Sequence, residues 1–197
     1  MSEGETPEEL AGRPVISFAT VPDCETWFAE HHAEHRGFWL KIGKAGAAET
    51  VTYAEALDVA LCHGWIDGQK RGYDATYWLQ RFTPRGPRSK WSQINRDKAE
   101  ALIKAGRMRP AGRAQIDAAK ADGRWATAYA GQKSATVPDD LAAALAADPE
   151  ASAFFETLKG ADRFAILYRV HDAKKPETRA ARIAKFVEMC HNHETVH

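Results

Sequence analysis

The sequence predicts an α+β protein with a small β-sheet and helices in its N-terminal two-thirds and an all-helical C-terminal third. Two observations predict this class. Short segments rich in aromatic and β-branched residues, which are typical of strands, occur before about residue 85. After Val137 the apolar residues repeat with helical spacing. We therefore expect an α+β domain over residues 15–130 and a helical region over residues 137–191.

The composition sets limits on the class of protein. The 197 residues are 44% hydrophobic and include six Trp, which is enough to bury a core, so disorder as the main state is excluded. Lys plus Arg and Asp plus Glu both number 27, so the formal net charge is zero. This balance excludes a protein that works by being basic over its whole surface.

Four segments have the composition of strands. They are residues 15–19, 38–42, 65–68 and 73–82. The last two segments are expected to pair, with aromatic residues along the pair. Between the first two segments, Asp23 is placed to cap a helix that ends before Gly37.

Capping residues predict the first long helix. Thr52 and Glu55 have the spacing of a capping box, in which the hydroxyl accepts from the later amide and the carboxylate reaches back. Leu57 and Leu61 follow one turn apart, and Gly64 is placed to end the helix.

Turn and capping residues also place the later helices. Ser92 follows a Pro/Gly/Arg loop and is a good N-cap for a helix running to about Ala105. Pro110 can start the next helix, which Gly123 ends. The C-terminal helices are expected to begin at Asp139 or Asp140, at Asp148-Pro149, near Arg163 and at Pro176.

Charge is unevenly distributed although the total is zero. Residues 1–35 hold eight acids against one base, and residues 81–113 hold ten bases against two acids. The basic stretch over 81–113 can mark an anion-binding surface or a nucleic-acid-binding module in which Phe82 and Trp91 stack on bases. The alternative is a solvated basic face, or one neutralised by the acidic N-terminal segment.

The cellular location of the protein is predicted from sequence features that are absent. The first fourteen residues contain no apolar block, and no apolar run approaches the ~20 residues that span a bilayer. Cys24, Cys62 and Cys190 lie far apart and lack metal-ligand spacing. We therefore expect a cytoplasmic protein with reduced thiols and without membrane insertion.

Seven ordered motifs resemble one known family. They are LCHGWIDG (61–68), RFTPR (81–85), SKWSQIN (89–95), GRMRPAG (106–112), AKADGRW (119–125), VPDDLAAAL (137–145) and AKKPETRAARI (173–183). Over about residues 20–190 the chain resembles the YdeI/OmpD-associated family, also called bacteriocin-protection proteins. The resemblance implies a role in stress or antimicrobial-peptide tolerance and supplies no reaction, cofactor or catalytic residue. Members are described as periplasmic, whereas we expect no export signal here.

Three of these motifs suggest a binding pocket. Ser92 is expected at a helix N-terminus, where free amides and the helix dipole favour an anion. Arg is suited to bidentate contact with carboxylate or phosphate, and Trp can stack on a planar group. The predicted ligand-binding residues for a small anionic or planar molecule are Trp65, Asp67, Arg81, Arg85, Trp91, Ser92 and Asn95.

Other interpretations of the same residues stay open. In a structural one, Trp65 and Trp91 fill the core, Asp67 neutralises Arg81 and Ser92 is only a cap. In a catalytic one, Asp67 is an acid/base group and Arg81 holds an anionic substrate. Because familiar hydrolase, kinase and dehydrogenase motifs are absent, no cofactor is expected and an enzyme would be an unusual one.

Two groups of histidines are candidate metal ligands. His31 and His35 stand in an H-x-x-E-H pattern, which resembles the zinc motif of one metalloprotease class. The pattern lies at the polar end of a helix and lacks a third ligand. His191, His193 and His197 form a His-rich tail of the kind that binds metal opportunistically. We therefore expect no physiological metal site.

Overall fold

The computed structural model describes residues 8–33 and 36–196. They form two compact units, each with its own core. The first, which we call the sheet unit, contains the described residues up to Trp91 together with Asn95–Thr127. The second, the helical unit, contains Ser92–Ile94 and the described residues from Ala128 onward.

The sheet unit is built on a mixed sheet of four strands, with the order β1-β2-β4-β3. The strands are β1 (Val15–Ile16), β2 (Phe38–Gly43), β3 (Trp65–Gly72) and β4 (Tyr77–Pro84). β1 is parallel to β2, whereas β4 is antiparallel to both β2 and β3. Because this sheet precedes a part that contains only helices from residue 139 on, the predicted α+β class is confirmed.

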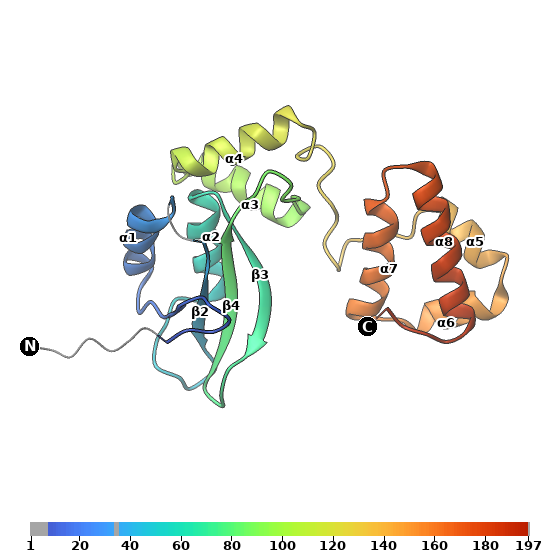
Figure 1. Ribbon diagram of the computed structural model, residues 1–197, viewed down its shortest axis with the longest axis horizontal. Helices are drawn as coiled ribbons and strands as arrows, with labels where there is room; N and C mark the ends of the chain where they lie inside the picture. The colour runs from blue at the N-terminus through green and yellow to red at the C-terminus, as the bar shows by residue number, and fades with distance from the viewer. Residues whose placement is uncertain (1–7, 34–35, 197) are drawn as a thin grey trace, which may run out of the picture. The chain divides into compact units, whose positions relative to one another are not determined.

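Two helices cover one face of this sheet (Figure 1). They are α1 (Val21–His31) and α2 (Tyr53–Cys62). Phe38 and Leu40 of β2 are fully buried, and side chains two apart on a strand point to the same face. The ring of Phe28 on α1 lies 5.8 Å from that of Phe38, so this face carries the core of the sheet unit.

Both helices begin with a capping box. For α2 the predicted pair is confirmed, since the Thr52 hydroxyl accepts from the Glu55 amide and the Glu55 carboxylate accepts from the Thr52 amide. For α1 the prediction that Asp23 is the N-cap is wrong. Thr20 is the N-cap, and Asp23 stands three residues later as the reciprocal partner.

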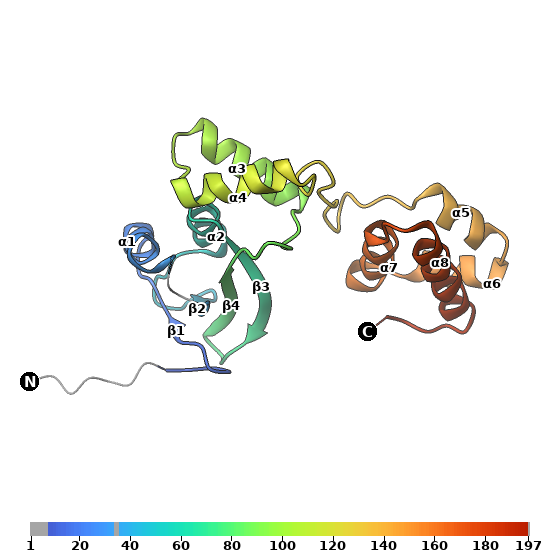
Figure 2. The same cartoon turned by 45° about the horizontal axis from the view of Figure 1, so that its top comes forward.

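The helices α3 (Gln93–Lys104) and α4 (Pro110–Ala121) lie side by side at one end of the sheet (Figures 1 and 2). The first two residues of α3 are counted with the helical unit. α4 contacts α2 at Gly112, where a Cβ atom would stand 2.3 Å from the carbonyl oxygen of Cys62. Only glycine permits this approach, which brings the start of α4 against the end of α2.

The helical unit consists of four helices in its described part. They are α5 (Asp139–Ala146), α6 (Pro149–Thr157), α7 (Gly160–Asp172) and α8 (Pro176–His191). α8 packs against the other three, with Phe186 among the buried residues of their shared core. No helix in the described ranges is long and apolar enough to cross a membrane.

All three cysteines are buried and free. Burial raises the pKa of Cys24 to about 12, and it also raises the pKa of Cys62 and Cys190. Because the thiolate is the reactive form, alkylation of these thiols requires unfolding. Cys24 and Cys62 therefore report on the sheet unit and Cys190 on the helical unit.

Candidate functional site

Both tryptophans of the predicted pocket lie in the core of the sheet unit. Trp65 is 1% exposed, its ring lies 5.2 Å from that of Phe28, and its Nε1 donates to the His32 carbonyl at 3.1 Å. Trp91 is 2% exposed and packs edge-on against Trp125 at 4.8 Å. Their rings already have protein neighbours.

Arg85 and Trp91 are brought together, as a buried pair. The guanidinium carbon of Arg85 stands 3.5 Å from the centre of the Trp91 ring, within the range of a cation–π contact. Arg85 is 5% exposed, and its Nη1 donates to the carbonyl of Lys90 at 3.1 Å. The pair stabilises the loop that precedes α3.

Asp67 and Arg81 lie on opposite faces of the sheet. Asp67 pairs with Phe82, and its carboxylate accepts from the Tyr53 hydroxyl of α2 at 2.9 Å, which places it on the helix-covered face. Arg81 precedes Phe82 on β4 and therefore points to the other face. Its guanidinium lies beside Gly68, in the β-bulge that follows Asp67.

The last two predicted residues are buried polar ones. Asn95 belongs to the sheet unit, whereas Ser92 belongs to the helical unit, where it forms an isolated bridge with Tyr129. The structure therefore brings Arg85 and Trp91 together and separates Asp67 from Arg81. A ligand-binding role for the seven, and an acid/base role for Asp67, stay predictions.

The basic stretch over 81–113 is partly neutralised. Lys98 donates to the carboxylate of Asp58 on α2 at 2.8 Å. Arg107 lies 3.3 Å from the carboxylate of Glu25 on α1, so part of the acidic N-terminal segment balances it. These pairs reduce the positive charge available to a nucleic acid, and nucleic-acid binding stays a prediction.

The histidine patterns yield no metal cluster in the described part of the chain. Glu34 and His35 of the H-x-x-E-H pattern, and His197 of the tail, lie outside the described residues. Among the residues that the structure describes, no group of three or more potential ligands gathers. His191 pairs instead with Asp148, which caps α6.

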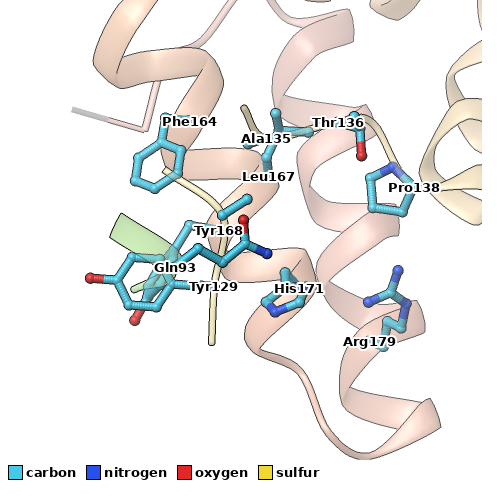
Figure 3. Close-up of a pocket in the computed structure, with 11 residues that line it drawn as sticks. Gln93, Tyr129, Ala135, Thr136, Pro138, Phe164, Leu167, Tyr168, His171 and Arg179 are labelled. Carbon is cyan, nitrogen blue, oxygen red and sulfur yellow. The ribbon is translucent and has the colours of Figure 1, made fainter. Parts of the chain in front are cut away.

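The helical unit contains a pocket of about 330 Å³, which we call the helical pocket (Figure 3). It is lined by Gln93, Tyr129, Ala130, Ala135, Thr136, Pro138, Phe164, Leu167, Tyr168, His171 and Arg179. Three of these residues are aromatic. The Tyr168 ring lies 5.0 Å from that of Tyr129 and 5.9 Å from that of Phe164. One side of the pocket is therefore an aromatic wall.

The other side of the helical pocket is polar. Figure 3 shows Arg179 across from the aromatic wall, with His171 between them. The Arg179 Nε and Nη2 donate to the Asp140 carboxylate at 2.5 and 2.8 Å, and Nη1 donates to the Val170 carbonyl at 2.8 Å. The bond to Arg179 lowers the pKa of Asp140, so the two charges balance. This side offers hydrogen-bonding groups without a free net charge.

The helical pocket was not predicted from the sequence, although the sequence contains one signal for it. Phe164, Tyr168 and His171 recur at spacings of four and three residues, which forms a second stripe on α7 beside its apolar one. Tyr129 comes from the connecting segment before α5. Such a segment has no periodic pattern from which the position of its side chains could be predicted.

The sheet unit contains a second cavity, of about 450 Å³, which we call the α4 cavity. It is lined by Glu25, Ala29, His32, His63, Arg109, Pro110 and Ala111. His63 follows α2 and Arg109 precedes α4, so two of the resembling motifs, LCHGWIDG and GRMRPAG, meet here. The His63 ring is stacked 5.5 Å from Phe28 and lies 5.3 Å from His32.

His63 is expected to make stability fall in mild acid. Burial lowers its pKa below the usual 6.5, the charges of His32 and Arg109 lower it further, and the bond to Val59 and the charge of Glu25 oppose the shift. Below about pH 6.5 the unfolded chain therefore binds a proton that the folded chain does not, so the unfolding free energy decreases as the pH falls.

Urea unfolding at a series of pH values between about 7.5 and 5 checks this. His63→Phe keeps the stacking on Phe28 but has no titrating ring. Its unfolding free energy should fall less over this range than that of the unaltered protein. An equal or steeper fall in the variant would contradict the assignment.

Comparison with known families covers both units. Residues 16–115 match a domain of unknown function (DUF8412). Residues 134–193 match the family described as Bacteriocin-protection, YdeI or OmpD-Associated, so the resemblance predicted from the sequence is confirmed there. No curated protein and no solved structure matches the chain. The chain thus belongs to the DUF8412 family through its N-terminal half and carries a bacteriocin-protection, YdeI or OmpD-associated domain in its C-terminal part.

Proposed function

We propose that this protein binds a small planar molecule in the helical pocket. The observation that carries the proposal is the aromatic wall of Tyr129, Phe164 and Tyr168, whose rings lie 5.0 and 5.9 Å apart around a pocket of about 330 Å³. A pocket of this volume suits a small ligand, and an aromatic wall favours a flat one.

The polar side of the pocket favours an uncharged ligand with hydrogen-bonding groups. The amide of Gln93, the hydroxyl of Thr136 and the imidazole of His171 can each donate or accept. Arg179 is balanced by Asp140, so a carboxylate would gain little from it. Of the two ligand classes predicted from the sequence, the planar one fits this pocket better than the anionic one.

The family name supports a biological context for this binding. The C-terminal domain belongs to a family described by bacteriocin protection. We therefore propose that ligand binding serves tolerance of peptide antimicrobials. The buried, free thiols support our proposal of a cytoplasmic location.

A series of small probes tests the proposal on the full chain. Benzamide is planar and neutral, cyclohexanecarboxamide has the same amide on a puckered ring, and benzoate is planar and charged. We expect benzamide to bind with a Kd of about 1 mM, as suits a ligand of so few atoms. Cyclohexanecarboxamide should bind about 5-fold more weakly because it cannot stack, and benzoate should bind no tighter than benzamide.

Tyr168→Leu keeps apolar bulk in the wall but removes the flat ring, and it should weaken benzamide binding about 5-fold. Tyr73→Leu is the matched control, since Tyr73 is 38% exposed on the sheet unit. NMR titrations supply the dissociation constants, and the protection of Cys190 from alkylation shows that the variant is folded. Equal affinities for the two amides, or a folded Tyr168→Leu variant with unchanged affinity, would exclude the proposal.

A further inference from the structure

The α4 cavity stands at the N-terminus of α4. α4 begins at Pro110, which has no N–H, and its N-cap residue Arg109 makes no side-chain capping bond. The amides of Ala111 and Gly112 therefore lack acceptors within their own helix. Such an end carries partial positive charge and favours an anion, and α4 is twelve residues long.

The charged residues of the α4 cavity favour the same kind of ligand. Arg109 is exposed, and among the described residues its guanidinium has no hydrogen bond or ion pair. The acid of the cavity, Glu25, is already 3.3 Å from Arg107. The net effect at the cavity is therefore one uncompensated positive charge beside the amide of Ala111.

A buried histidine gives the independent observation that points to a ligand. His63 is 6% exposed and lines the cavity. Its Nδ1 lies 3.1 Å from the Val59 carbonyl, and because a carbonyl only accepts, Nδ1 carries the proton. In the neutral ring Nε2 is then an acceptor, and it has no partner among the residues that the structure describes.

His32 repeats this arrangement from the neighbouring helix. Its Nδ1 lies 2.8 Å from the carbonyl of Phe28, one turn back on α1, just as that of His63 faces Val59 on α2. Both rings are thus held by backbone carbonyls with Nε2 left as the acceptor. The cavity combines donors for negative oxygen atoms with acceptors for a proton.

We propose that the α4 cavity binds a small oxyanion that carries its own O–H group, with the negative oxygens on Arg109 and the amide of Ala111 and the O–H donated to His63. Hydrogen phosphate and 2-hydroxy carboxylates share this chemistry. A divalent metal ion is a poorer match, since Arg109 and the positive helix end repel it. The site is independent of the helical pocket, so each proposal can fail without the other.

Two pairs of probes that differ in the O–H group test this proposal by calorimetry on the full chain. At about pH 7.5, where His63 is neutral, inorganic phosphate still carries a proton and sulfate does not; glycolate carries a hydroxyl and acetate does not. We expect the O–H member of at least one pair to bind about 10-fold tighter than its partner. The pair that shows this difference identifies the ligand as a phosphate or a hydroxy acid.

Three variants locate the binding. Arg109→Ala, an exposed change, should weaken binding of the preferred ion about 10-fold to 100-fold, as expected for loss of a charge-assisted hydrogen bond. Arg88→Ala removes the same charge from an exposed loop position and should change nothing. His63→Phe should abolish the preference for the O–H member of the pair while leaving the weaker ion's affinity unchanged.

The expected pattern is preference for the O–H ion, loss of affinity in Arg109→Ala, and loss of preference in His63→Phe. Absence of binding by all four ions up to about 20 mM, equal affinities within both pairs, or unchanged affinity in Arg109→Ala would each overturn the proposal. If His63→Phe does not fold, the ion pairs and the exposed Arg109 variant still decide the matter.

Discussion

Gly112→Ala is expected to destabilise the sheet unit by about 3 kcal/mol. A Cβ atom at this position would stand 2.3 Å from the Cys62 carbonyl oxygen and 2.7 Å from that of Leu61. Both are backbone atoms at the end of α2, so they cannot rotate away and α4 must shift instead. Because alanine is better than glycine inside a helix by about 1 kcal/mol, a loss of stability can only come from this contact.

Urea unfolding followed by cysteine alkylation and mass spectrometry measures the effect in each unit. Gly112→Ala should lower the urea concentration at which Cys24 and Cys62 become labelled, while Cys190 is labelled as before. Gly72→Ala is the control, since a Cβ there meets nothing within 4 Å. A Gly112→Ala protein as stable as the original, or more stable, would show that α4 does not depend on this approach.

Trp65→Ala is expected to cost about 3–5 kcal/mol of unfolding free energy, as large-to-small changes of buried aromatics do. The indole is 1% exposed and packs against Phe28 and Phe38, and its Nε1 bonds to the His32 carbonyl. Removing it leaves a cavity in the core of the sheet unit and breaks the link to the residue after α1.

The same unfolding experiment measures this change, with Trp78→Ala as the matched control. Trp78 is half-buried on β4, where Lys70 lies 4.4 Å from its ring centre. Its removal should cost clearly less than that of Trp65, since less apolar surface returns to water. If Trp65→Ala lost less than about 1 kcal/mol, the indole would not be a core residue and would be available to a ligand.

Local features of the fold could be predicted because their partners are close in sequence. Thr52 and Glu55 stand three residues apart, and the spacing alone predicts the capping box that the structure contains. Pro110 and Pro176 open helices where expected, since proline is tolerated in the first turn. At α1 the prediction named Asp23 and the N-cap is Thr20, because both residue types are common N-caps and composition does not separate them.

Features that depend on register could not be predicted. Both strands that hold Asp67 and Arg81 were expected, yet a shift of one residue moves a side chain to the other face of a sheet. The bulge after Asp67 changes that register, and nothing in the sequence fixes its position except Gly68. The structural interpretation of an Asp67–Arg81 pair therefore does not follow from the presence of both residues.

The two cavities were missed for a third reason. His63 and Arg109 are 46 positions apart in sequence and meet because Gly112 allows α4 to approach α2. In the helical pocket, Tyr129 meets Tyr168 through a connecting segment that has no periodicity. Such sites are made by tertiary contacts, so the spacing of Phe164, Tyr168 and His171 on α7 indicates one wall of the helical pocket but not the cavity itself.

The central claim is that a planar ligand occupies the helical pocket, and intermolecular nuclear Overhauser effects from bound benzamide test it most directly. We predict contacts from the benzamide ring protons to the rings of Phe164 and Tyr168, which form the aromatic wall. Contacts to the indole protons of Trp65 or Trp91, or binding without any contact to α7, would contradict it.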